Sequence, residues 1–172
     1  STLTSSSAAS DVYKRQGSPH IHMLAWIKDA KILDKDPDEE VIAFIDSIMT
    51  CSRPKEGPLK DLVAYQVHSH SKTCLKGKKF KCRFNFPLPP MRETTILRPL
   101  SVCNKDSNEI ETLKSSKKKI YQRLKDMKAG EDITFDEFLA SLEMDEQTYL
   151  DALAYDLKET QIYLKRLPYE IR

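Results

Sequence analysis

The first regular pattern of hydrophobic and polar positions is an alternation over residues 17–27. Successive side chains of a strand point to opposite faces, so the pattern predicts a β-strand. On that strand His20 and His22 share one face with Leu24 and Trp26, while apolar residues occupy the other face. A polar connection over 28–37 follows it.

Helical periodicity begins at Asp38, which we expect to cap a helix. The apolar positions on the predicted buried face are Val41, Phe44, Ile45 and Ile48. Two prolines and a glycine in 52–58 end this helix. Residues 59–67 then predict a short helix or an extended segment with Leu62 and Val63 turned inward.

The remainder of the chain is mostly helical in pattern. Residues 94–102 predict a strand, which Pro99 restricts to the edge of a sheet. The predicted helices are residues 109–127, a short helix at the capping box of Thr134 and Glu137, and a longer helix from Asp145 to about Leu167, where Pro168 stops it. The chain is therefore expected to have an α+β fold with a helical C-terminal half.

Composition predicts a folded, soluble protein. The 172 residues suggest one domain, and 40% hydrophobic residues suffice for a packed core. No apolar run approaches the roughly 20 residues needed to span a bilayer, so we expect no membrane partner. The formal charge is only +2, but no acid lies between Asp61 and Glu93, whereas acids dominate after Asp126. The basic middle indicates a local surface for a polyanion.

The first residues share no pattern with the rest. Residues 1–10 are rich in serine, threonine and alanine, and we expect residues 1–16 to be disordered. Residues 11–16 resemble the translation of a transposase mosaic-end adaptor used in sequencing libraries. We therefore expect the native sequence to begin at Gly17 and the protein to be a fragment.

The cysteines indicate metal chemistry rather than a disulfide framework. They lie far apart in a chain that can bury its own core, at Cys51, Cys74, Cys82 and Cys103. A short span holds four ligands suited to tetrahedral zinc, namely His68, His70, Cys74 and Cys82. Which histidine binds is open. The alternative is a basic surface loop with two free thiols and incidental histidines.

The same segment alternates aromatic and basic residues. The rings are Phe80, Phe84 and Phe86, and the candidate nucleic-acid contacts are Lys76, Lys78, Lys79, Lys81 and Arg83. Rings that stack on bases beside cations that contact phosphates are typical of single-strand binding. The alternative is a strand with its rings in the core and its charges in solvent.

Three motifs in this order resemble the helitron helicase-like (Rep) domain of Helitron rolling-circle transposons. They are Gly-Ser-Pro-His-Ile-His at 17–22, Gln-Val-His-Ser-His-Ser-Lys-Thr-Cys at 66–74, and Cys-Arg-Phe-Asn-Phe-Pro at 82–87. The resemblance extends over residues 17–172. It implies a nuclear protein of the HUH endonuclease class, with a mostly antiparallel sheet, that cuts and rejoins single-stranded DNA.

The resemblance also implies site residues. His20 and His22 would hold Mg or Mn, which would polarise the scissile phosphate. Two isolated histidines on an edge strand are the simpler alternative. Members of the family attack with two tyrosines one helical turn apart, but none of the seven tyrosines here lies four residues from another. The nucleophiles and the helicase are expected beyond Arg172, so the fragment alone is expected to be inactive.

The resulting fold expectation is a partial HUH-type antiparallel sheet with flanking helices and a zinc-clipped loop. The expected organisation is a non-native segment at 1–16, a metal-binding, basic region at 17–107 and a helical region of the same domain at 108–172. The expected partners of the protein are single-stranded DNA and the rest of the transposase and helicase chain. Two other interpretations stay open: a zinc-stabilised nucleic-acid-binding module without catalysis, and an inactive transposon remnant.

Overall fold

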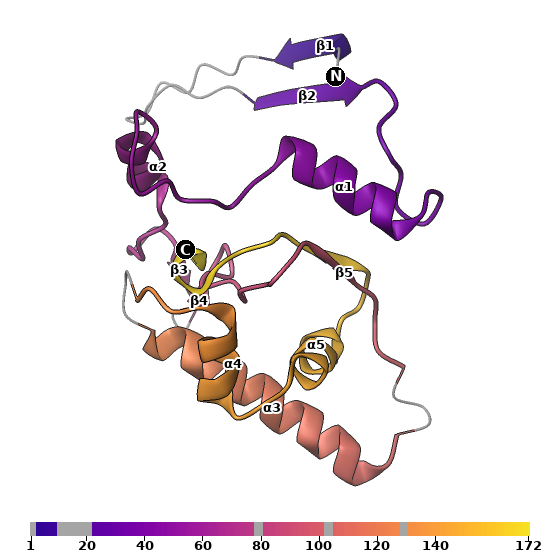
Figure 1. The fold of residues 1–172 in the computed structure, drawn as a ribbon, viewed down its shortest axis with the longest axis vertical. Helices are drawn as coiled ribbons and strands as arrows, with labels where there is room; N and C mark the ends of the chain where they lie inside the picture. Colours follow the sequence, from indigo (N-terminus) through magenta and orange to yellow (C-terminus); the bar gives the residue numbers. More distant parts are fainter. Residues whose placement is uncertain (1–2, 10–21, 78–80, 102–104, 128–130) are drawn as a thin grey trace. The chain divides into compact units, whose positions relative to one another are not determined.

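A computed structural model of the protein describes residues 3–9, 22–77, 81–101, 105–127 and 131–172 (Figure 1). The chain divides into two compact units, Ser1–Ser47 and Ile48–Arg172. The fold is mixed α/β, and the described strands form two-stranded antiparallel sheets. The expected α+β class is thus confirmed at this level.

The first unit contains a strand pair and one helix. β1 (Leu3–Ala9) pairs antiparallel with β2 (His22–Ile27), with Ala9 opposite His22. The strand expected at 17–27 is therefore present from His22 onward, and its earlier residues lie outside the described part. β1 occupies residues for which we expected disorder; strand pairing uses backbone groups, so even a serine-rich segment can form it.

The helix of this unit is α1 (Asp38–Ile48), which begins where the sequence predicts. Three acids occupy its first turn, where the positive end of the helix dipole favours them. Val41 is buried, as expected of the predicted inner face. Ile48 is 45% exposed, so the apolar face weakens toward the end of the helix.

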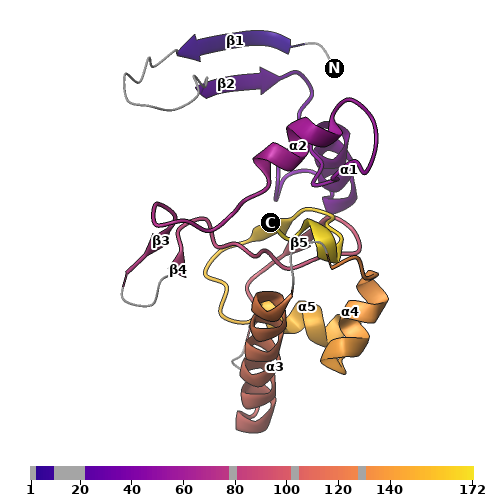
Figure 2. The same cartoon turned by 90° about the vertical axis from the view of Figure 1, so that its left-hand side faces the viewer.

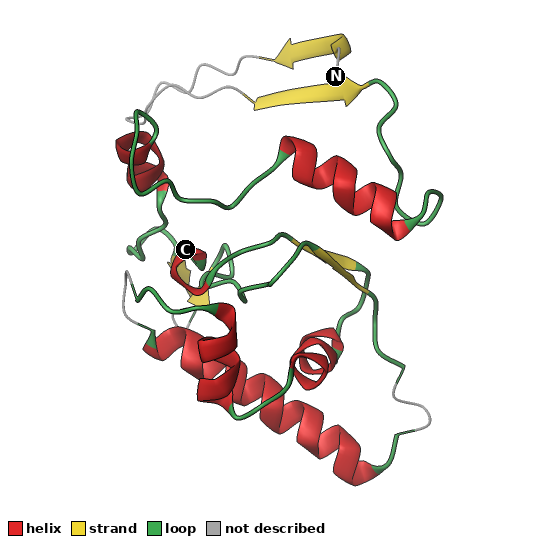
Figure 3. Ribbon diagram, viewed as in Figure 1, coloured by secondary structure: helices red, strands yellow, loops and turns green. Residues whose placement is uncertain are grey.

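The second unit has its core in three helices near the C-terminal end of the sequence (Figures 1 and 3). They are α3 (Ser107–Asp126), α4 (Phe135–Leu142) and α5 (Glu146–Ala154). Capping side chains begin each one, and the predicted box of Thr134 and Glu137 at α4 is confirmed. The fully buried side chains at the centre include Ile120, Leu124, Phe138, Leu142, Tyr149 and Leu153.

The last predicted helix is wrong beyond Ala154. Asp156 adopts a left-handed conformation with φ of 65°, which interrupts the helix. The chain then forms β6 (Gln161–Tyr163), which pairs antiparallel with β5 (Thr95–Leu97). β5 covers the first part of the strand predicted at 94–102, and it ends before Pro99. Backbone pairing between these distant segments overrides the helical appearance of residues 155–167.

A proline-rich segment joins the helical core to the end of the sequence. Met91 and Arg166 exchange backbone hydrogen bonds of 2.8 and 3.0 Å, and the Leu88 N–H donates to the Ile171 carbonyl. The Tyr149 hydroxyl, on α5, donates to the Pro90 carbonyl at 2.8 Å. A short 3-10 helix, η1 (Pro168–Glu170), comes after Arg166. The Glu170 side chain, at the end of this helix, is buried.

The segment that carries the candidate site lies before this scaffold. α2 (Lys60–Gln66) confirms the helical option for 59–67, but Leu62 is 56% exposed rather than turned inward. β3 (Leu75–Lys76) and β4 (Lys81–Cys82) then form a hairpin that projects from the helices of its unit (Figure 2). Within the described residues, no helix combines the length and the apolar character required to cross a bilayer.

The Tyr149 hydrogen bond provides a test of the scaffold. Tyr149 is fully buried, and Tyr149→Phe leaves the buried Pro90 carbonyl without this donor. We expect the free energy of unfolding in urea to fall by about 1–2 kcal/mol. Tyr65→Phe is the matched control, because the Tyr65 side chain is 85% exposed and its hydroxyl is hydrated in both states. Equal stability of the two variants would contradict this role for Tyr149.

Candidate metal centre

The hairpin brings the two cysteines together. Cys74 comes directly before β3 and Cys82 ends β4, where it pairs with Leu75. The Arg83 N–H donates to the Cys74 carbonyl at 2.8 Å, which extends the pairing past the cysteines. Both side chains are buried although the hairpin itself is small. The two buried thiol groups therefore lie close together, with their sulfur atoms within 4.8 Å of each other.

The two histidines reach the same point from the end of α2. The helix stops at Val67, whose ψ of 127° turns the chain into an extended conformation. His68 Nε2 then lies 3.3 Å from His70 Nδ1 and 3.4 Å from Cys82 Sγ, and His70 Nδ1 lies 3.6 Å from Cys74 Sγ. All four candidate ligand atoms lie within 4.8 Å of one another. The expected zinc cluster is therefore assembled, with both histidines in it.

These separations fit tetrahedral zinc. Zinc binds nitrogen at about 2.0–2.1 Å and sulfur at about 2.3 Å, so a tetrahedron places two nitrogens about 3.3–3.4 Å apart and a nitrogen and a sulfur about 3.5–3.6 Å apart. The His68–His70 distance of 3.3 Å and the two nitrogen–sulfur distances of 3.4 and 3.6 Å match these values. Three of the six ligand separations thus match a tetrahedral zinc site, and the other three are at most 4.8 Å.

Neighbouring groups hold the ligands in place. The Ser71 N–H points at Cys74 Sγ over 3.2 Å, an arrangement that stabilises a thiolate. The His68 ring stacks on Phe86 with centroids 4.7 Å apart, and it meets the edge of Phe84 at 5.5 Å. These contacts fix the orientation of the imidazole. The four-residue spacing between His70 and Cys74 is typical of a turn, in which the Ser71 N–H can approach Cys74. Nothing in the sequence indicates that Phe86 stacks on His68.

Electrostatics favour the form of His68 that binds a metal. Partial burial lowers the pKa of His68, and the neighbouring His70 and Arg172 lower it further. The neutral imidazole, which has a free lone pair, therefore predominates at neutral pH. Four protein ligands also complete the tetrahedron, as in sites whose zinc supports structure; catalytic zinc keeps one position for water or substrate. A metal bound by all four residues would link the hairpin to the end of α2.

The structure leaves the other predicted metal site undecided. His20 lies outside the described residues, and of His22 only the backbone, at the start of β2, is described. The expected Mg or Mn therefore has no support from the geometry. The cofactor that the structure supports is a metal such as zinc at His68, His70, Cys74 and Cys82.

The predicted nucleic-acid contacts are described in part. Lys78 and Lys79 lie outside the described residues, as does the side chain of Lys76. Lys81 and Arg83 are both exposed on the hairpin. Both side chains are therefore accessible to solvent, and their predicted contact with nucleic acid stays a prediction.

The aromatic residues do not form the regular strand that their alternation predicts. β4 contains only Lys81 and Cys82, and Asn85 has a positive φ of 59°. Phe84 is 48% exposed, and the Arg83 guanidinium lies 4.4 Å from the centre of its ring. Phe84 is therefore outside the core and forms a cation–π pair on the surface. Phe80 lies outside the described residues.

No protein-family model matches this chain, and comparisons with curated proteins and with solved structures found no similar protein.

The metal centre predicts one zinc ion per chain. Cys74→Ser and Cys82→Ser should each lower the zinc content to well below one equivalent, because either change removes a ligand. Cobalt substitution should give the visible absorption of a tetrahedral thiolate site in the wild type only. Cys51→Ser is the control: Cys51 lies outside the cluster, and a hydroxyl can still accept from Arg166. Zinc content well below one equivalent in the wild type would contradict the site.

Proposed function

We propose that the Ile48–Arg172 unit binds single-stranded DNA through a zinc-clipped basic hairpin, as part of a Helitron-type replication initiator. The observation that carries the proposal is the cluster of His68, His70, Cys74 and Cys82 at the base of the hairpin. The exposed residues described beside it include Lys81, Arg83 and Phe84. DNA itself and the family are inferred from the sequence motifs. The geometry supports the binding function more directly than it supports catalysis.

The hairpin has the two features that single-strand binding requires. Arg83 and Lys81 supply positive charge for phosphates, and no acidic residue lies between Asp61 and Glu93 to neutralise it. Phe84 supplies a half-exposed ring on which a base can stack, already paired with a cation. The metal holds both features in one orientation, because His68 contacts Phe84 and Cys82 precedes Arg83.

Neutralising the hairpin should weaken DNA binding and reduce its dependence on salt. Lys81→Gln with Arg83→Gln should lower the affinity for a fluorescent oligothymidylate roughly tenfold at low salt, because two phosphate contacts are lost. The slope of log affinity against log salt should become shallower by about 1.4, or about 0.7 for each contact. Fluorescence anisotropy at several salt concentrations measures both quantities.

The matched control is Lys125→Gln with Lys158→Gln, which removes the same charge from exposed positions on other elements. Its affinity and salt slope should stay close to those of the wild type. An equal loss in both double variants would show that only net charge matters, and it would contradict a hairpin site.

A second function, cleavage of single-stranded DNA, is favoured by the start of β2 at His22, the last residue of the His-Ile-His motif. We propose that β2, which begins at His22 and pairs antiparallel with β1, carries the metal half of a HUH active site. His20 and His22 would bind Mg or Mn there, and a tyrosine from a later part of the initiator would attack the phosphate. The resulting phosphotyrosine link would conserve the bond energy for rejoining.

This second function is tested on an initiator chain that continues past Arg172 and includes the paired tyrosines. Such a chain should nick single-stranded DNA with Mg or Mn, and His20→Ala with His22→Ala should abolish nicking while zinc content is unchanged. Nicking is measured by denaturing electrophoresis of an end-labelled strand. Undiminished nicking by the double variant would contradict the assignment of these histidines, without affecting the zinc-clipped hairpin.

A further inference from the structure

Two cavities adjoin between α2 and the C-terminal segment of the Ile48–Arg172 unit. One has a volume of about 610 Å³ and the other of about 230 Å³, and both are lined by Arg53, Ala64 and Tyr169. The larger cavity reaches His68 and His70, and the smaller reaches Lys60 on α2. Because three residues line both cavities, the two are neighbours, and together we call them the α2 groove.

The α2 groove is strongly cationic. Its charged lining residues, apart from the histidines, are Arg53, Lys55, Lys60, Arg172 and Asp132. Asp132 is the only acid among them, and its carboxylate is paired with Lys55 at 2.6 Å. The nearby Glu170 carboxylate is buried and accepts from the backbone N–H groups of Arg53 and Leu167. The groove therefore offers a surplus of positive charge to an anion.

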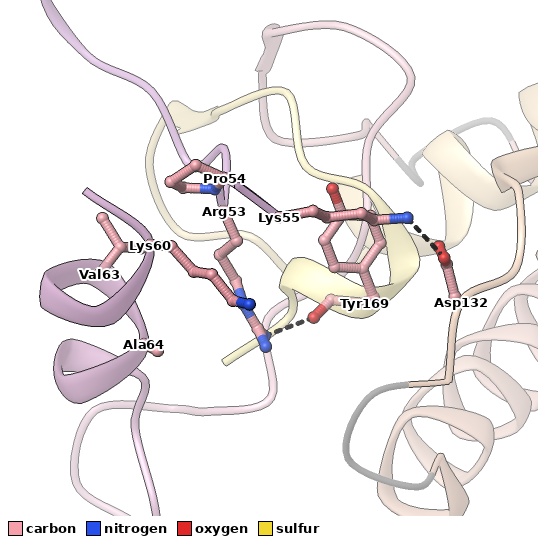
Figure 4. Close-up of a pocket in the computed structure, with 8 residues that line it drawn as sticks. All are labelled: Arg53, Pro54, Lys55, Lys60, Val63, Ala64, Asp132 and Tyr169. Atoms are coloured by element: carbon pink, nitrogen blue, oxygen red, sulfur yellow. Dashed lines mark hydrogen bonds and ion pairs between the residues drawn. The ribbon is translucent and has the colours of Figure 1, made fainter. Parts of the chain in front are cut away.

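The cations are held in position by the scaffold. The Arg53 guanidinium donates to the Tyr169 carbonyl at 2.6 Å, while Lys55 lies 5.2 Å from the centre of the Tyr169 ring. Figure 4 shows the Lys60 side chain reaching from α2 toward Arg53. Among the described residues, buried Arg172 Nε has no hydrogen-bond acceptor, and such a donor costs free energy until one is supplied. A phosphate oxygen is an acceptor that suits a guanidinium.

An exposed aromatic ring stands at the wall of the larger cavity. Tyr65 lines it from α2 and is 85% exposed, the largest exposure among the large hydrophobic and aromatic side chains of the described residues. His68, which also lines this cavity, contacts the ring of Phe84 on the basic hairpin. Rings at two points along a line of cations are the arrangement that accommodates successive bases of a single strand.

We propose that the α2 groove continues the nucleic-acid path of the hairpin, so that one strand runs from Arg83 and Phe84 past the metal centre to Tyr65 and Lys60. The strand's phosphates face the cations of the groove, and one base stacks on Tyr65. This inference rests on the proposed single-strand binding function and adds a second contact region to it. A duplex would not fit in the same way, because its bases are already stacked and present no free ring faces.

The test compares variants of the two regions with the oligothymidylate used for the hairpin. Tyr65→Ala should weaken binding roughly tenfold through the loss of stacking. Lys60→Gln should make the salt slope shallower by about 0.7, as the loss of one phosphate contact does. Leu62→Ala is the control for α2, because Leu62 is exposed on the same helix and does not line either cavity. All three variants should keep one zinc and the wild-type unfolding midpoint.

A second measurement locates the strand directly. Ultraviolet cross-linking of an iodouracil-substituted strand, read by mass spectrometry, should place adducts on Tyr65 as well as on Phe84. Wild-type affinity in Tyr65→Ala and Lys60→Gln, with weakened binding in the hairpin variant, would overturn the groove and leave the proposed function intact. Absence of salt-dependent binding in every protein, wild type included, would overturn both.

Discussion

The convergence of four ligand atoms within 4.8 Å is the constraint on which the proposed function depends. The hairpin that bears the basic residues has two residues in each strand, and its polar loop offers little to bury. Such a short hairpin is marginally stable in water on its own. Metal ligation would replace the missing core, because it would link the end of α2 to the hairpin through side chains that already lie together. The orientation of Phe84 and Arg83 follows from this link.

The helical scaffold could be predicted well from sequence because its signals are local. Asp38, Asp145 and the pair of Thr134 and Glu137 mark helix starts within one turn of their own position, and the structure has helices at each. The helix predicted to run on to Leu167 ends at Ala154, because the structure that follows depends on a distant segment. Residues 161–163 become a strand only because β5, far away in sequence, pairs with them. A local pattern contains no information about that partner.

The candidate site shows the same division. The spacing of His68, His70, Cys74 and Cys82 predicted the ligand set, since all four belong to one short segment. The stacking of Phe86 on His68 and the cavities beside α2 could not be predicted, because they depend on how Arg53, Tyr169 and Arg172 are brought to this segment. The alternation of aromatic and basic residues predicted exposed cations beside rings, but it did not predict the backbone. The strand is short, and Asn85 adopts a positive φ that a strand does not allow.

The hydrogen bonds between Arg53 and the C-terminal segment also have a consequence for the order of assembly. They join residues 116 and 117 positions apart, whereas the metal ligands His68 and Cys82 are separated by 14. During synthesis from the amino end, the clip can capture its ion long before Tyr169 and Glu170 leave the ribosome. A metallated hairpin would thus form first, and the contacts of Arg53 with Tyr169 and Glu170 would follow once the final residues of this unit have been translated.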